Sequence, residues 1–178
     1  MRWKSTPEAY GRAAIAMHWV SAALILGLLA AGFIAANTAD PAAKASILRL
    51  HAPLGITVLV LTLARLLWWA LADRKPPQPK GLPAWQSMSA RLVHIGLMVA
   101  TLGLAGSGIA LFAWSGAGAI VMAGAPQPLP DFWDYPPRYA HAALARLAVI
   151  LVALHIAAAL YHQFVRKDRI FSRMGVGQ

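Results

Sequence analysis

Four long apolar segments dominate this 178-residue sequence and restrict the folds that it can adopt. They span about residues 13–36, 47–72, 92–112 and 139–164, and each reaches the roughly 20 residues that a helix needs to cross a bilayer. Only 12% of the residues are charged, about half the usual share in a soluble domain, and the mean hydropathy is +0.57. The sequence therefore predicts an all-α fold, an integral membrane four-helix bundle in which residues 1–178 form a single membrane domain.

The basic residues, which give a net charge of +10, are unevenly distributed between the predicted loops. Only Lys44, Arg49 and Arg138 lie on the side reached after the first and third spans. The opposite side carries Arg2, Lys4, Arg12, Arg74, Lys75, Lys80, Arg91, Arg166, Lys167, Arg169 and Arg173. This positive-inside bias predicts that both termini are cytoplasmic. We therefore expect the lipid bilayer as the partner of this basic chain and no nucleic acid.

The first span could also be read as a cleaved signal peptide, because it has a basic start and small residues at 35–39. Its apolar run is longer than the roughly 7–15 residues of a typical signal core. Cleavage would also remove His18. We therefore expect the span to be retained.

Six histidines lie in or at the edge of the apolar segments: His18, His51, His94, His141, His155 and His162. Imidazole is costly in hydrocarbon and marks a functional site by default. With the N-terminus inside, His51 and His141 begin the second and fourth spans at the outer face, whereas His18 lies near the inner face.

The fourth span offers histidines at two depths. His155 follows His141 by 14 residues, which is about 21 Å along a helix and within about 40° of the same direction. His162, one heptad further, falls on that face too. Each depth therefore has a histidine on the fourth span and a partner on another helix: His155 with His18, and His141 with His51.

The chain has no cysteine, which excludes thiolate-ligated haem, iron–sulfur clusters and covalent haem attachment. Two stacked haems, each between two imidazoles, fit the two depths. A zinc site fits poorly, because it needs three or four converging ligands. A proton relay is the alternative, although relays usually include carboxylates and no Asp or Glu lies within the four spans.

Small residues lie one helical turn from four of the histidines, as a flat macrocycle requires. They are Ala14 and Ala22 for His18, Gly55 for His51, Ala145 for His141 and Ala159 for His155. Small residues are also common in membrane helix packing, which is the alternative explanation. His94 instead has Met98 on one side and His162 has Arg166. These two histidines stay unassigned between a quinone or proton pathway, ligation in place of one of the four predicted ligands, and simple packing.

Two arginines lie beside the predicted outer ligands, on the side that is poor in cations. Arg49 precedes His51 and Arg138 precedes His141. Their guanidinium groups could bind haem propionates through charge-assisted hydrogen bonds. Chance placement at the surface is the alternative for each.

These motifs resemble those of the bacterial cytochrome b561 proteins. The similar stretches are 15–20 around His18-Trp19, 50–56 around His51 and running on to Arg65, and 154–162 before Lys167-Asp168. His94 and the proline-rich loop after the second span are also similar, so that the resemblance extends from about residue 13 to 174. The long second external loop and Arg146 depart from the pattern.

The resemblance implies a two-haem b protein of the bacterial inner membrane that exchanges electrons with quinone. It implies non-covalent haem ligation by His18 with His155 at the inner site and by His51 with His141 at the outer site. It also implies superoxide as a possible electron donor, or another periplasmic redox partner, with ubiquinone as acceptor. A haem b membrane-anchor subunit of a dehydrogenase or hydrogenase is the alternative, and a haem-free proton-coupled transporter a third.

Overall fold

The computed structural model describes residues 2–78, 81–125 and 128–177, and in these residues it contains helices and no strand. Its four long helical segments are α1 (Arg12–Asn37), α2 (Pro41–Leu67) continued by the π-helix η1 (Trp68–Ala72), α3 (Ala84–Ser115), and α5 (Pro136–Leu160) continued by the π-helix η3 (Tyr161–Arg166). The short elements are α4 (Ala117–Ala123), the 3₁₀ helix η2 (Phe132–Asp134) and α6 (Ile170–Arg173). All four long segments have the length and composition to cross a membrane, which confirms the predicted all-α class.

Each long helical segment is longer than the span predicted from the sequence, because the helices continue into polar residues at their ends. α3 begins at Ala84 and α2 at Pro41, both well before their predicted spans. In α2, Pro41 occupies the first turn and the Asp40 carboxylate accepts hydrogen bonds from the backbone of Ala42 and Ala43. Pro136 and Pro137 occupy the first turn of α5, which has no side-chain cap. Lys80 of the charge pattern lies outside the described residues.

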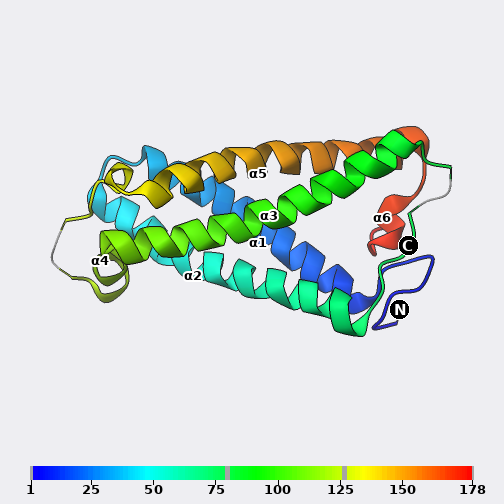
Figure 1. Ribbon diagram of the computed structural model, residues 1–178, viewed down its shortest axis with the longest axis horizontal. Coiled ribbons are helices and arrows are strands. Elements are labelled where there is room, and N and C mark those ends of the chain that lie inside the picture. The colour runs from blue at the N-terminus through cyan, green and yellow to red at the C-terminus, as the bar shows by residue number, and fades with distance from the viewer. Residues whose placement is uncertain (1, 79–80, 126–127, 178) are drawn as a thin grey trace.

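Small residues set the distances between helices in the bundle. α3 runs along α5, and α1 along α2 (Figure 1). On α3, a Cβ atom placed on Gly103 would lie 2.8 Å from Cδ1 of Leu144 on α5, and one on Gly96 would lie 3.0 Å from Cδ1 of Leu151. The two backbones therefore approach closely because α3 has no side chain at these positions.

The outer surface of the bundle is apolar. Phe33 is 74% exposed and Val99 is 60% exposed, and other large hydrophobic side chains of the long helices are similarly uncovered. A surface of this kind is unfavourable in water but matches the hydrocarbon of a bilayer. The buried positions of the long helices are mostly small, such as Ala14, Ala100 and Ala148.

Both termini lie at one end of the bundle (Figure 1). There, three segments contact one another and form what we call the terminal cap: residues 2–11, 73–78 and 167–177. The Arg173 guanidinium donates hydrogen bonds to the backbone carbonyls of Pro7, Glu8 and Pro77, at 3.3, 3.0 and 2.8 Å. The cap therefore connects the N-terminus, the loop after α2 and the C-terminus.

Asp73 fastens the N-terminal segment to the end of α2. Its carboxylate accepts hydrogen bonds from the backbone and hydroxyl of Ser5, the indole of Trp68 and the backbone of Arg74. Desolvation raises the pKa of Asp73, but the bonds from Ser5, Arg74 and Trp68 outweigh it and hold that pKa below its usual value.

Candidate cofactor site

Three histidines from three helices meet toward the cap end of the bundle. The ring centres of His18 on α1 and His155 on α5 are 6.2 Å apart, and those of His94 on α3 and His155 are 5.2 Å apart. Trp19 packs against His18 with a centre distance of 5.2 Å. The structure therefore brings together the predicted inner pair and adds His94 to it.

A second pair of histidines lies further from the terminal cap. The ring centres of His51 on α2 and His141 on α5 are 6.4 Å apart. As the sequence predicts, α5 contributes one histidine to each pair. The two pairs therefore occupy two levels of one bundle, because His155 follows His141 by 14 positions along α5.

The centre distances within the two pairs match imidazoles that share one metal ion. A ligating nitrogen lies about 2.0 Å from a metal such as zinc, and the ring centre roughly 1 Å further, so two opposed imidazoles have centres about 6 Å apart. The pairs His18–His155 and His51–His141, at 6.2 and 6.4 Å, both fit this spacing. The His94–His155 distance of 5.2 Å is too short for it.

Hydrogen bonds orient the outer histidine of α5. Nδ1 of His141 lies 3.1 Å from the backbone oxygen of Leu104 and 3.1 Å from Oγ of Ser107. When Nδ1–H donates to the Leu104 carbonyl, Nε2 is the nitrogen left to bind a metal. Within the described residues Nδ1 of His51 is buried without a partner.

Two glycines that the sequence did not connect with any histidine lie against the outer rings. A Cβ on Gly32 of α1 would be 3.2 Å from Cε1 of His51, and one on Gly108 of α3 would be 3.4 Å from Cε1 of His141. Gly55, which the sequence did single out, differs, because a Cβ there would meet no described atom within 4 Å. Open space one turn from His51 is what a flat macrocycle needs, so the residues fit a haem.

The two arginines predicted beside the outer ligands have partners in the structure. Arg49 donates from Nε to the backbone oxygen of Val121 in α4, at 2.8 Å, and so connects α2 to α4. The Arg138 guanidinium lies 4.5 Å from the ring centre of Trp133, an arrangement typical of a cation–π contact. Neither contact uses all the donors of a guanidinium group, so a role toward an anionic cofactor group stays a prediction.

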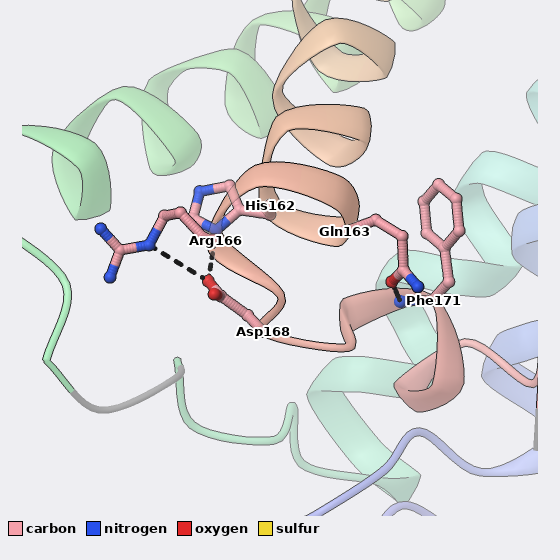
Figure 2. Close-up of polar contacts among 5 residues, drawn as sticks. All are labelled: His162, Gln163, Arg166, Asp168 and Phe171. Atoms are coloured by element: carbon pink, nitrogen blue, oxygen red, sulfur yellow. Dashed lines mark hydrogen bonds and ion pairs between the residues drawn. The ribbon is translucent and has the colours of Figure 1, made fainter.

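His162, which the sequence left unassigned, pairs with a carboxylate that the sequence argument did not consider. Its Nδ1 lies 2.5 Å from Oδ2 of Asp168, and Nε of Arg166 lies 3.5 Å from the same oxygen. Figure 2 shows both side chains directed at the Asp168 carboxylate. Lys167 and Arg169, on either side of Asp168, adopt positive φ angles of 60° and 55°. The chain therefore turns sharply twice to place Asp168 under η3, which local sequence patterns do not reveal.

Two histidine pairs at two levels of a four-helix membrane bundle define a class of protein, membrane cytochromes that hold haem between helices. A comparison with known protein families identifies the family within this class. The family described as prokaryotic cytochrome b561 matches residues 9–177, and the chain belongs to that family. It is thus a multi-pass bacterial membrane protein that binds haem b and carries electrons.

Individual relatives agree with the family assignment. Cytochrome b561 homolog 2 of Escherichia coli K12 is 28% identical over 98% of this chain and 95% of its own. The probable superoxide oxidase CybB of Yersinia pestis is 30% identical over 94% of this chain and 96% of its own. Cytochrome b561 homolog 1 of E. coli K12 is 33% identical, over 70% of this chain and 72% of its own.

Proposed function

We propose that the protein carries electrons through two bis-histidine haem b groups between the periplasmic face and the quinone pool. His18 and His155 would hold the inner haem, and His51 and His141 the outer one. The observation that supports this most directly is the repeated ring spacing, 6.2 Å in one pair and 6.4 Å in the other, on two levels of α5. One pair of imidazole rings with this spacing could arise from packing alone. Two such pairs at two levels of one helix match a protein with two cofactor sites.

The residues around each pair determine what the cofactor can do. Haem b supplies one-electron chemistry when bound. His51 and His141 would hold the group with two imidazoles, which would leave no open ligand position for oxygen. The Leu104 carbonyl keeps His141 in the tautomer that presents Nε2. The two levels, about 21 Å apart along α5, provide a path across most of the membrane.

Superoxide is the outer electron donor that we propose, with ubiquinone as the acceptor. Lys44, Arg49 and Arg138 carry positive charge at the end of the bundle where His51 and His141 lie, and positive charge attracts an anionic donor. A relative carries the name probable superoxide oxidase, which favours the same activity. The protein would then act as a superoxide:quinone oxidoreductase.

We also propose that the cap end faces the cytoplasm and that the bilayer is the bacterial inner membrane. The even number of candidate spans puts both termini on one side, and the cap end carries the excess of Lys and Arg. The outer histidine pair would then lie toward the periplasm. This orientation places the anion-attracting arginines where an external donor arrives.

Rapid-mixing spectroscopy of the purified holoprotein tests this function. Superoxide should reduce the haem within the mixing experiment, and added ubiquinone should reoxidise it. If the haem stays oxidised under superoxide but is reduced by a quinol, the superoxide activity is excluded and the protein is a quinol-oxidising cytochrome. Stable co-purification of a dehydrogenase or hydrogenase would instead support a membrane-anchor subunit.

A further inference from the structure

An open hollow lies beside the terminal cap, where the N-terminal segment crosses the end of the second span. Its volume is about 480 Å³, and Lys4, Ser5 and residues 69–74 line it. A smaller hollow of about 170 Å³ shares Ser5 and Arg74 with it and extends to Lys75. The hydrogen bonds between Ser5 and Asp73 hold the N-terminal segment in place and so create this concavity.

Among the described residues, no ion pair neutralises the cations around the hollow. Within the described residues, the two ion pairs are formed by Asp168, and neither includes Lys4, Arg74 or Lys75. Asp73 is the carboxylate that lines the hollow, but Ser5, Trp68 and its own neighbour's backbone already occupy its oxygens. Burial lowers the pKa of Lys75, and the charge of Arg65 lowers it further, so a bound anion beside Lys75 would favour its charged form.

The far wall of the hollow is the apolar end of the second candidate membrane span. Residues 69–72 are the end of the second span, and among them Leu71 is 82% exposed. Leu67, one turn earlier on the same helical segment, is 59% exposed. The Lys75 ammonium lies 5.7 Å from the ring centre of Trp69, at the boundary between the basic and the apolar wall. A basic recess that continues into a lipid-facing apolar surface fits an anionic amphiphile better than a free anion.

We propose that this hollow binds an anionic phospholipid of the adjoining leaflet. Lys4, Arg74 and Lys75 surround the phosphate of the headgroup, and an acyl chain lies along Leu67 and Leu71. The bound lipid neutralises the cations and connects the N-terminal segment to the second span. This site is independent of the haem ligands and of the donor to the outer haem.

Lipid titration of the detergent-solubilised holoprotein, followed by native mass spectrometry, tests the site. Phosphatidylglycerol should bind more tightly than phosphatidylcholine. The triple variant Lys4→Gln/Arg74→Gln/Lys75→Gln should weaken phosphatidylglycerol binding at least about tenfold, because each cation near a lipid phosphate contributes severalfold. The control variant Arg2→Gln/Arg91→Gln/Lys167→Gln removes the same charge outside the hollow and should weaken it less than about twofold. Equal weakening in both variants would mean diffuse surface charge and would overturn the proposal.

A measurement on the unmutated protein separates lipid from free phosphate. Hydrogen exchange is compared in nanodiscs of phosphatidylcholine, in nanodiscs that also contain phosphatidylglycerol, and in phosphatidylcholine nanodiscs with inorganic phosphate. Phosphatidylglycerol should slow exchange at Ser5 and at 70–74, while inorganic phosphate should not. Equal protection by phosphate would make this a free-anion site, and no protection by either would leave the hollow without a ligand; both results overturn the proposal.

Discussion

The two levels of the bundle hold their histidines differently. The outer level has a single pair, with Gly32 and Gly108 against the rings and a backbone carbonyl at Nδ1 of His141. The inner level has three histidines, and His155 contacts both His18 and His94. At the outer level, the glycine and carbonyl contacts therefore surround a single pair of candidate ligands. At the inner level, distance is what distinguishes the candidate ligand His18 from the extra histidine His94.

The two ends of the bundle also differ in how their charged side chains are held. Beyond the outer level, Arg49 and Arg138 are held by a carbonyl and an aromatic ring, and no ion pair involves them in the described residues. Beyond the inner level, the terminal cap joins three chain segments through Arg173 and Asp73. Free positive charge at the outer end would attract a soluble anion, whereas hydrogen bonds of the terminal cap connect the segments at the inner end.

Reporter fusions give the largest expected effect, because topology is all-or-none. Fusions at Gln178 and within 74–83 should report the cytoplasm, and fusions near Pro128 should report the periplasm, since charge bias sets orientation. Alkaline phosphatase and a fluorescent protein provide reciprocal readouts. A periplasmic C-terminus would exchange the two levels and with them the assignment of inner and outer site.

Alanine substitutions of the histidines, followed by measurement of haem content, show which histidines hold haem at each level. The purified protein should carry about two low-spin haem b groups, and pyridine haemochrome quantitation should show about one in each ligand variant. His51→Ala and His141→Ala should empty the outer site, and His18→Ala and His155→Ala the inner one.

The matched control for these variants is His94→Ala, which should retain both haems because its ring is too close to His155 to share a metal with it. Loss of a haem in His94→Ala, with both haems kept in His18→Ala, would reverse the inner assignment.

Glycine substitutions test the tight fit of the outer level. Gly32→Val should lower outer haem occupancy and destabilise the holoprotein by roughly 1–3 kcal/mol, because a Cβ there would already be 3.2 Å from His51. Gly27→Val on the same helix is the control, since a Cβ at Gly27 meets no described atom within 4 Å. Thermal denaturation and haem spectra measure both effects. Equal losses in the two variants would show that helix propensity, and not the ring contact, is responsible.

Positive charge at the outer end should affect the rate of haem reduction more than the stability of the fold. Reduction of the haem by superoxide should slow as salt increases from about 0.01 to 0.15 M, since the Debye length falls from about 30 to 8 Å. Arg49→Gln/Arg138→Gln should slow reduction further, by up to about tenfold at low salt, and haem content has to be unchanged for the comparison to hold. A rate that does not depend on salt would exclude steering by these arginines.

The smallest effect is expected at the terminal cap. The folded-state pKa of Asp73 is below its unfolded value, so its contribution to stability is present above the unfolded pKa of about 3.9 and is lost as the pH falls through the folded pKa. At pH 7, Asp73→Asn should therefore speed hydrogen exchange at Ser5 and Gly11, and the difference from the wild type should shrink in acid. A difference that persists unchanged below the unfolded pKa would show that charge on Asp73 is not involved.

The sequence predicted the fold class and the grouping of histidines because both depend on periodic features. An apolar run of sufficient length predicts a membrane helix without any tertiary information. Helical geometry then predicts that His141 and His155 share a face and lie at two depths, and the structure places both toward their expected partners. Whether these pairs bind haem is still a prediction.

Local sequence patterns could not predict the contacts between distant segments. Gly55 was chosen for its spacing from His51, but the glycines in contact with the rings are Gly32 and Gly108, which come from other helices. The partner of His162 is Asp168, which is brought under the helix by two residues at positive φ. Spacing along one helix cannot identify a neighbour that arrives from another helix or from a sharp turn.

The amino-acid sequence by itself determined that this chain forms four apolar helices with histidines at two depths, because helix length and periodicity are properties of a single segment. The tertiary structure decided which side chains face those histidines and how the cap joins residues 2–11 to 73–78 and 167–177. These outcomes depend on the distance between helices, and that distance is set by small residues such as Gly96 and Gly103 meeting leucines of another helix.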